Sequence, residues 1–145
     1  FKYMSADLAA RYSHAPDYPE VAKRALAEMV RQVGGDQTTF DEDGIMKRGV
    51  IVRHLELPGC IEDSKAVVRY LYKTYGNNIY ISIMNQYTPM EGIGEKFPEL
   101  NRKLTEREYD ELVDYAISIG VENGFIQEGE TASESFIPPF TNEGI

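Results

Sequence analysis

The chain has 145 residues, of which 42% are hydrophobic, so it can bury a single core and form one domain. Its formal net charge of -9 argues against nonspecific binding to nucleic acid, because such binding depends on clustered Lys and Arg. The single cysteine, Cys60, excludes an internal disulfide, and without a signal peptide or an apolar run long enough to span a bilayer we expect a cytoplasmic protein that does not enter membranes.

The first expected element is an amphipathic helix. Asp17 with Glu20 is typical of a capping box at its start, and Gly34-Gly35 ends it. Apolar residues recur at helical spacing between these points: Val21, Ala22, Ala25, Leu26, Met29 and Val33. A loop through Asp36 and Gly44 is expected to follow.

A strand, a helix and a second strand are expected next. Val50–Leu57 and Ile79–Met84 are predicted strands. The helix between them begins at about Asp63, is closed by Gly76 and has an apolar face made of Val67, Val68, Leu71 and Tyr75. Strands joined in this way pair in parallel through a crossover, which is nearly always right-handed, so the pattern predicts a parallel α/β architecture.

Beyond Pro89 a long loop, marked by Gly92, Gly94 and Pro98, leads to a second capping box at Thr105 and Glu108. The helix that begins there should extend to Gly120 with one apolar face: Tyr109, Leu112, Val113, Ala116 and Ile117. Three further features are expected in the tail: a short strand at Gly124–Gln127, a loop at Glu128–Glu134, and an end of regular structure at Pro138-Pro139.

Polar side chains gather where the two predicted strands end. Gly49–Ser64 is a strand with Arg53 that leads into an acidic helix start, and Ile79–Pro89 is an apolar strand that ends in Asn85 and Gln86. Parallel sheets place their binding chemistry at the carboxyl ends of strands. Arg53, Asn85 and Gln86 are therefore candidate ligand-binding residues.

These residues also have structural interpretations. An arginine inside an apolar strand needs an anion, because an unpaired buried charge is costly, and Glu56 or an acid on another element is a candidate partner for Arg53. Asn85 and Gln86 can instead cap the end of the strand and order the following loop.

No metal site is expected in this chain. His54 alternates away from Arg53 and should face the helix layer, and neither His54 nor His14 has a second ligand at metal spacing. Cys60 is expected to be a packed or partly exposed thiol without a nearby base.

The motif RHLELPG, Arg53–Gly59, resembles the fifth-strand segment of radical S-adenosylmethionine enzymes of the pyruvate formate-lyase activating enzyme type, which read Arg, four residues, then Pro-Gly. The opening Phe1–Met4 is similar to the Asp-Leu-Lys-x-Met end of their fourth strand. Gly124–Phe140 resembles the ending of a subgroup related to that activating enzyme. The similarity covers nearly the whole chain in order.

This resemblance implies the C-terminal part of a partial (β/α) barrel, with residues 1–145 as the C-terminal portion of the domain. In the family, a reduced [4Fe-4S] cluster on a Cys-x3-Cys-x2-Cys loop cleaves S-adenosylmethionine to a 5'-deoxyadenosyl radical, which abstracts a hydrogen atom from a substrate. One cysteine cannot hold such a cluster, so we expect the cluster only in a longer protein and no activity from this fragment. The implied partners are a glycyl-radical enzyme or other protein substrate, and an electron donor such as flavodoxin or ferredoxin.

The resemblance also implies roles for individual residues. Lys2 matches the lysine that reaches the methionyl end of S-adenosylmethionine, and Arg53 matches an arginine in the same cofactor site. Asn85 and Gln86 stand where the sixth strand of the family turns polar. Gln86-Tyr87 replaces a Tyr-His pair, so hydrogen bonding can persist there while imidazole chemistry cannot.

A different class of function is also compatible with the sequence. The chain can be a free-standing, noncatalytic α/β module that binds a nucleotide-like ligand or a protein. An in-frame Cys-x3-Cys-x2-Cys segment upstream of Phe1 would favour the enzyme, and an initiator Met immediately before Phe1 would favour the module.

Overall fold

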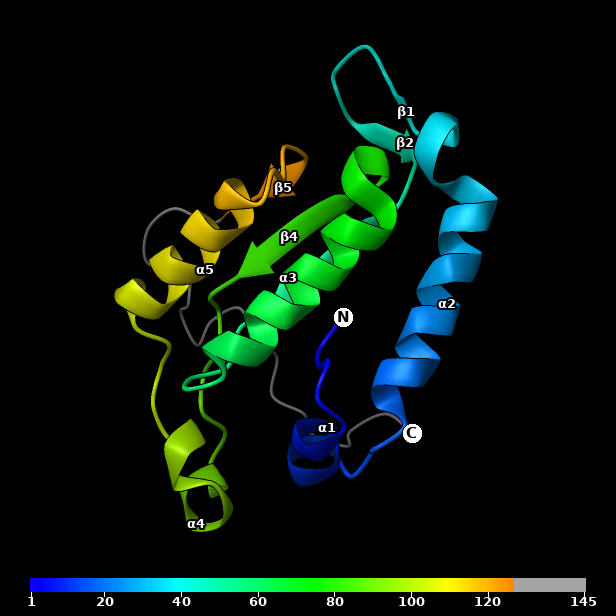
Figure 1. Ribbon diagram of the computed structural model, residues 1–145. Coiled ribbons are helices and arrows are strands. Elements are labelled where there is room, and N and C mark those ends of the chain that lie inside the picture. The colour runs from blue at the N-terminus through cyan, green and yellow to red at the C-terminus, as the bar shows by residue number, and fades with distance from the viewer. Residues whose placement is uncertain (127–145) are drawn as a thin grey trace, which may run out of the picture.

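A computed structural model describes residues 1–126 (Figure 1). The α-helices are α1 (Ala6–Ser13), α2 (Tyr18–Val33), α3 (Ile61–Tyr75), α4 (Ile93–Lys96) and α5 (Glu106–Ser118). The strands are β1 (Thr39–Phe40), β2 (Met46–Arg48), β3 (Ile51–Leu55), β4 (Tyr80–Met84) and β5 (Gly124–Phe125), with 3-10 turns η1 (Gly35–Gln37), η2 (Gly76–Asn78) and η3 (Pro98–Leu100). No helix in this part of the chain is long and apolar enough to cross a membrane.

The strands β3, β4 and β5 form a parallel sheet with β4 in the centre, which confirms the predicted parallel α/β architecture. Arg53 pairs with Ser82, and Ser82 pairs with Phe125, so these three residues form one row across the sheet. The predicted strand at Gly124–Gln127 is present as the short β5. The predicted loop at Glu128–Glu134 and the break at Pro138-Pro139 lie outside the described residues.

Helices α3 and α5 cover one face of this sheet (Figure 1). Helical spacing places Val67, Val68 and Leu71 of α3 and Leu112 of α5 in the core, where none of them is exposed. Alternate strand residues complete the same core: Val52, Ile81 and Ile83. Apolar residues that recur every 3.6 residues in the helices and every second residue in the strands thus form one apolar layer.

The helix ends show which predicted caps form. The capping box of Thr105 and Glu108 is present, with the Thr105 hydroxyl accepting from the Glu108 amide at 3.2 Å. The capping box predicted for α2 is wrong, because the side chain of Asp17 makes no capping hydrogen bond. Asp17 has helical backbone angles (φ -85°, ψ -2°), whereas a capping side chain needs an extended backbone.

Two predicted apolar faces are only partly buried. On α2, Leu26 is buried, but Val21 and Met29 are 45% and 50% exposed and Ala25 is exposed. On α5, Ile117 is 64% exposed, although it shares the predicted face with the buried residues. Periodicity identifies an apolar side of a helix, but the width of the stripe that is covered depends on the neighbouring elements.

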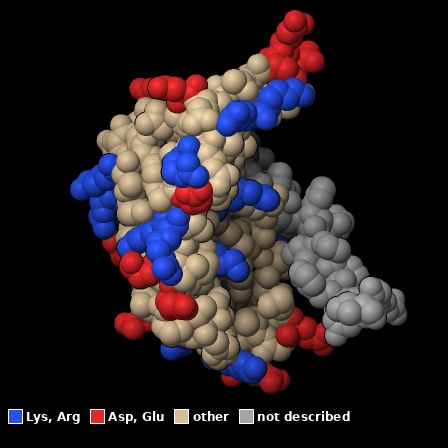
Figure 2. Space-filling model, turned by 90° about the vertical axis from the view of Figure 1, so that its right-hand side faces the viewer, with Lys and Arg blue, Asp and Glu red and all other residues tan. Residues whose placement is uncertain are grey.

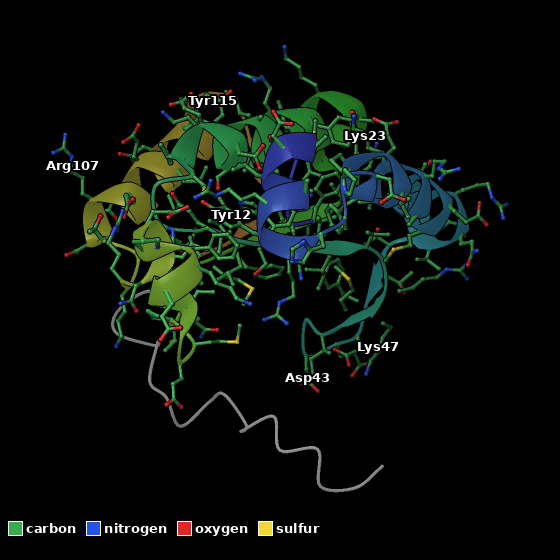
Figure 3. All side chains as sticks on the ribbon, turned by 90° about the horizontal axis from the view of Figure 1, so that it is seen from below. Tyr12, Lys23, Asp43, Lys47, Arg107 and Tyr115 are labelled. Atoms are coloured by element: carbon green, nitrogen blue, oxygen red, sulfur yellow. The ribbon has the colours of Figure 1, made fainter. Side chains whose placement is uncertain are left out.

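Three segments without predicted structure contain regular elements. The predicted long loop between Pro89 and Thr105 contains the short helix α4 and the turn η3. α1 follows the chain start, and Ser5 caps it by accepting from the Leu8 amide at 3.2 Å. The predicted loop from Asp36 to Gly44 contains η1 and half of the antiparallel β1–β2 hairpin. Asp41 closes the hairpin, since its Oδ1 accepts from the amide of Ile45 at 2.9 Å and its Oδ2 pairs with Lys47 at 2.8 Å. Figure 3 shows Lys47 on this hairpin, together with Asp43.

Leu112→Ala should lower the free energy of unfolding by about 3 kcal/mol, because it removes a fully buried side chain from the layer between α5 and the sheet. Ile117→Ala on the same helix is the control and should change it by less than about 0.5 kcal/mol. Urea denaturation of both variants measures the difference. Equal losses would contradict the assignment of the buried face.

Candidate functional site

Within residues 1–126, the sheet has a second face opposite α3 and α5, and part of that face is exposed. Strand alternation turns Val52 and His54 toward the helices, so the other β3 side chains point the opposite way. We call this side the open face and define it by Ile51, Arg53, Leu55, Tyr80, Ser82 and Met84. Ile51 and Arg53 are exposed on it, and the other four are half-buried.

Arg53 lies on the open face and is exposed, so the expectation that its guanidinium is buried is wrong. Within residues 1–126 its guanidinium makes no hydrogen bond or ion pair. The predicted alternative, an ion pair with Glu56, is also wrong, because Glu56 is three residues along the strand and its buried carboxyl has no hydrogen-bond partner there. Arg53 is therefore available to an anion.

The chain start lies beside β3 and brings Lys2 to the same edge of the sheet. The amino group of Phe1 donates to the carbonyl oxygen of Arg53 at 2.6 Å, and the amide of Lys2 donates to the hydroxyl of Tyr18 at 2.8 Å. The side chains of Phe1 and Tyr3 contact the ring of Tyr18, whereas Lys2, between them, is exposed. Lys2 thus directly follows the residue that bonds to the backbone of Arg53.

Asn85 and Gln86 follow β4 directly and are both half-buried. The amide of Glu56 donates to the carbonyl oxygen of Met84 at 3.1 Å, which continues the strand pairing to the point where these residues begin. The loop beyond is held by the hydroxyl of Tyr87, which donates to the carbonyl oxygen of Leu100 at 2.8 Å. The two amides therefore lie at the carboxyl end of the sheet, one strand away from Arg53.

Glu56 is a buried carboxyl that the sequence analysis considered only as a partner for Arg53. It has no exposed surface, and neither carboxyl oxygen has a hydrogen-bond partner within residues 1–126. Burial, together with the nearby carboxylates Glu108 and Glu111, raises its pKa to about 8, and the positive charge of Lys65 opposes this rise. Glu56 is therefore protonated at neutral pH. The alternation of strand residues could have predicted this burial, because residues 52, 54 and 56 share the buried side of the strand.

Glu108 and Glu111 are themselves paired. Glu108 accepts from the amide of Gly59 at 2.9 Å and from Arg102 at 2.8 Å, so it connects the loop after β3 to the start of α5. These donors keep the pKa of Glu108 well below its usual range. Glu111 pairs with Lys65 of α3 at 2.7 Å. The cations near Glu56 thus pair with Glu108 and Glu111, and none of them pairs with Glu56 within residues 1–126.

His54 has a structural role, as its strand parity predicted. Its Nδ1 lies 2.8 Å from the carbonyl oxygen of Phe1, and its Nε2 lies 2.8 Å from the hydroxyl of the buried Ser64 on α3. Burial lowers the pKa of His54 to about 4, so the ring is neutral at physiological pH. The imidazole therefore connects the chain start, β3 and α3.

A polar contact joins α1 to η3 near Cys60. The hydroxyl of Tyr12 donates to Glu99 at 2.9 Å, and Arg11 pairs with the same carboxylate at 2.6 Å. Figure 3 shows Tyr12 on α1, and its ring also meets Phe97 edge-on. Burial raises the pKa of the Cys60 thiol, which agrees with a packed thiol and not a reactive one.

Other surfaces of the described residues offer weaker sites. A depression of about 500 Å³ lies on the outer side of α5, where it is lined by Glu106, Arg107, Asp110, Glu111 and Asp114. Figure 3 shows Arg107 pointing away from the molecule. On the side of the molecule seen in Figure 2, basic and acidic side chains are interspersed. Residues 1–126 contain no group of three or more His, Cys, Asp or Glu arranged to hold a metal ion.

The chain was compared with known proteins. No protein-family model, curated protein or solved structure matches the chain. The candidate site therefore rests on the geometry of the open face and the carboxyl end of the sheet.

The protonation of Glu56 predicts that stability falls as the pH rises from about 4.5 to about 8. In the unfolded chain Glu56 ionises near its ordinary pKa of 4.5, whereas the folded protein keeps it protonated up to about pH 8. The unfolded state then binds fewer protons between these values, so stability decreases as pH rises through that window. Between pH 6.5 and 8 the free energy of unfolding should fall by about 2 kcal/mol.

Urea denaturation at the two pH values tests this on the wild type, on Glu56→Gln and on a control, Glu91→Gln, which removes an exposed carboxyl. Glu56→Gln should abolish most of the pH dependence, and Glu91→Gln should leave it unchanged. A wild-type slope that survives in Glu56→Gln would show that another group titrates.

Proposed function

We propose that this chain is the C-terminal part of a radical S-adenosylmethionine domain of the pyruvate formate-lyase activating enzyme type, and that the open face is its cofactor-binding wall. The observation that carries the proposal is the exposed guanidinium of Arg53, which has no partner within residues 1–126, on the sheet face that lacks α3 and α5. In a β/α barrel the helices cover the outside of the sheet and the other face lines the interior.

The arrangement of elements supports this proposal. β3, α3 and β4 form a parallel β-α-β unit, and α5 leads to β5, which pairs in parallel with β4. The helices after the strands lie on one side, as barrel units require. The edge of β3 accepts a hydrogen bond from Phe1, where the resemblance expects the neighbouring strand to end.

The residues of the open face fit the anionic end of S-adenosylmethionine. A guanidinium presents a planar fork of donors that suits a carboxylate, so Arg53 would bind and orient that group. Lys2 would add a mobile positive charge, and the amides of Asn85 and Gln86 would donate and accept at the carboxyl end of the sheet. When bound to a reduced [4Fe-4S] cluster, this cofactor supplies the radical chemistry of the family.

The cluster itself does not fit this chain, because Cys60 is its only cysteine. The proposal therefore assigns the cluster to a longer protein that contains these residues. A glycyl-radical enzyme or another protein as the substrate, with flavodoxin or ferredoxin as the electron donor, is proposed from the sequence resemblance alone.

Binding of S-adenosylmethionine tests the proposal on the 145-residue chain. Titration followed by two-dimensional NMR should shift the amide signals of Arg53, Ser82, Asn85 and Gln86 and leave the α2 signals in place. Arg53→Ala should weaken the affinity about tenfold or more, because a hydrogen bond to a charged group contributes about 1.5–3 kcal/mol. Arg69→Ala is the matched control, since Arg69 is exposed on α3 behind the sheet.

Two outcomes would count against the proposal. Equal affinity in folded Arg53→Ala and Arg69→Ala would remove Arg53 from the site. Binding of another nucleotide or of a protein, without binding of S-adenosylmethionine, would favour the noncatalytic module.

A further inference from the structure

The buried carboxyl of Glu56 lies close to an ion pair that joins two helices. The charges that act on it are Lys65 on α3 and the carboxylates Glu108 and Glu111 on α5. The ammonium of Lys65 donates to Glu111 at 2.7 Å and lies 5.7 Å from the centroid of the Tyr115 ring, so it holds α3 against α5. The neighbouring strand β4 has no charged side chain. Lys65 is therefore a cation with one carboxylate bound and a second one nearby.

Glu56 needs a cation when it ionises. Its side chain has no exposed surface, so water cannot solvate a charge there, and neither oxygen accepts a hydrogen bond from residues 1–126. A buried carboxylate without a partner is very costly. With a pKa of about 8, Glu56 nevertheless changes charge at mildly alkaline pH. The ionised state is therefore one in which a nearby cation has moved to Glu56.

Two cations lie near these carboxylates, and they are held differently. Arg102 binds Glu108 through two hydrogen bonds of 2.8 Å, and Glu108 is fixed further by the amide of Gly59. Lys65 binds Glu111 through a single contact of 2.7 Å. The side chain of Glu111 is 48% exposed, so water can solvate its carboxylate once the ammonium leaves. Lys65 is thus the cation that can exchange partners.

The other titratable groups beside this layer keep their protonation state near pH 8. The ring of His54 is already neutral, because burial lowers its pKa to about 4. The hydroxyl of Tyr109 donates to the carbonyl oxygen of Ile83 at 3.0 Å. Burial raises the pKa of Cys60 above its ordinary value, so the thiol stays protonated. A charge change here at mildly alkaline pH therefore belongs to Glu56.

We propose that Glu56 is a pH-sensitive switch that loosens α5 from α3 through an exchange of ion-pair partners. When Glu56 gives its proton to water, the ammonium of Lys65 leaves Glu111 and pairs with the new carboxylate. Lys65 keeps its own proton, and Glu111, which stays ionised, turns to solvent. The link between the helices is then lost, and α5 opens more often. This switch does not require a cofactor, so it is tested separately from the proposed function.

Hydrogen exchange of the 145-residue chain at pH 6.5 and pH 9, followed by mass spectrometry, tests the switch. Glu56→Gln has a neutral side chain of the same size at both pH values, so the ratio of wild-type to variant rates removes the intrinsic effect of pH. At pH 6.5 this ratio should be about one throughout. At pH 9 it should be at least about twofold larger in α5 than in α2, as expected for the loss of one ion pair.

A ratio at pH 9 that is equal in α2 and α5 would overturn the proposal. That result would show that ionised Glu56 destabilises the whole fold without releasing a particular helix.

Two further variants test the exchange of partners. Glu111→Gln removes the ion pair in advance, so the pH response of α5 should disappear. Glu28→Gln is the control, because it breaks a comparable pair with Arg31 on α2, at 2.6 Å, and should leave the response of α5 intact. Circular dichroism checks that both variants fold. A pH response of α5 that persists in Glu111→Gln would overturn the proposal.

Discussion

The packing of α3 against β3 and β4 is the interaction on which the rest of the structure depends. Val67, Val68 and Leu71 meet the inward side chains of both strands, and this contact fixes which strand residues are buried. The residues between them must then face the other way, because strand parity allows no alternative. The open face and the exposure of Arg53 both follow from this one-sided burial.

Strong local patterns predicted most of the fold. The spacing of Val67, Leu71 and Leu112 predicted the core faces of α3 and α5, and the reciprocal side chains of Thr105 and Glu108 predicted the start of α5. The predictions failed where tertiary context decides. The exposure of Val21, Met29 and Ile117 depends on how far neighbouring elements extend over each helix, which the sequence of that helix does not contain.

The sequence predicted where the candidate residues lie in the sheet but not what surrounds them. Arg53, Asn85 and Gln86 do lie on adjacent parallel strands or directly beyond them, because the carboxyl ends of β3 and β4 share one edge of the sheet. The apolar neighbours of Arg53 suggested burial, although a strand with one covered face exposes every second residue. The same parity, applied to Glu56, places a carboxyl in the core, where it has no hydrogen-bond partner among residues 1–126.

The two hydrogen bonds of the His54 ring also determine which ring nitrogen carries the hydrogen atom. A carbonyl oxygen can only accept, so Nδ1, facing Phe1, must donate, and the lone pair of Nε2 is left to accept from the Ser64 hydroxyl. The neutral imidazole is therefore fixed in the Nδ1-H tautomer, which is the minor one for free histidine side chains in water. The tautomer of this one buried ring thus reports whether the first residue of the chain is seated against the sheet.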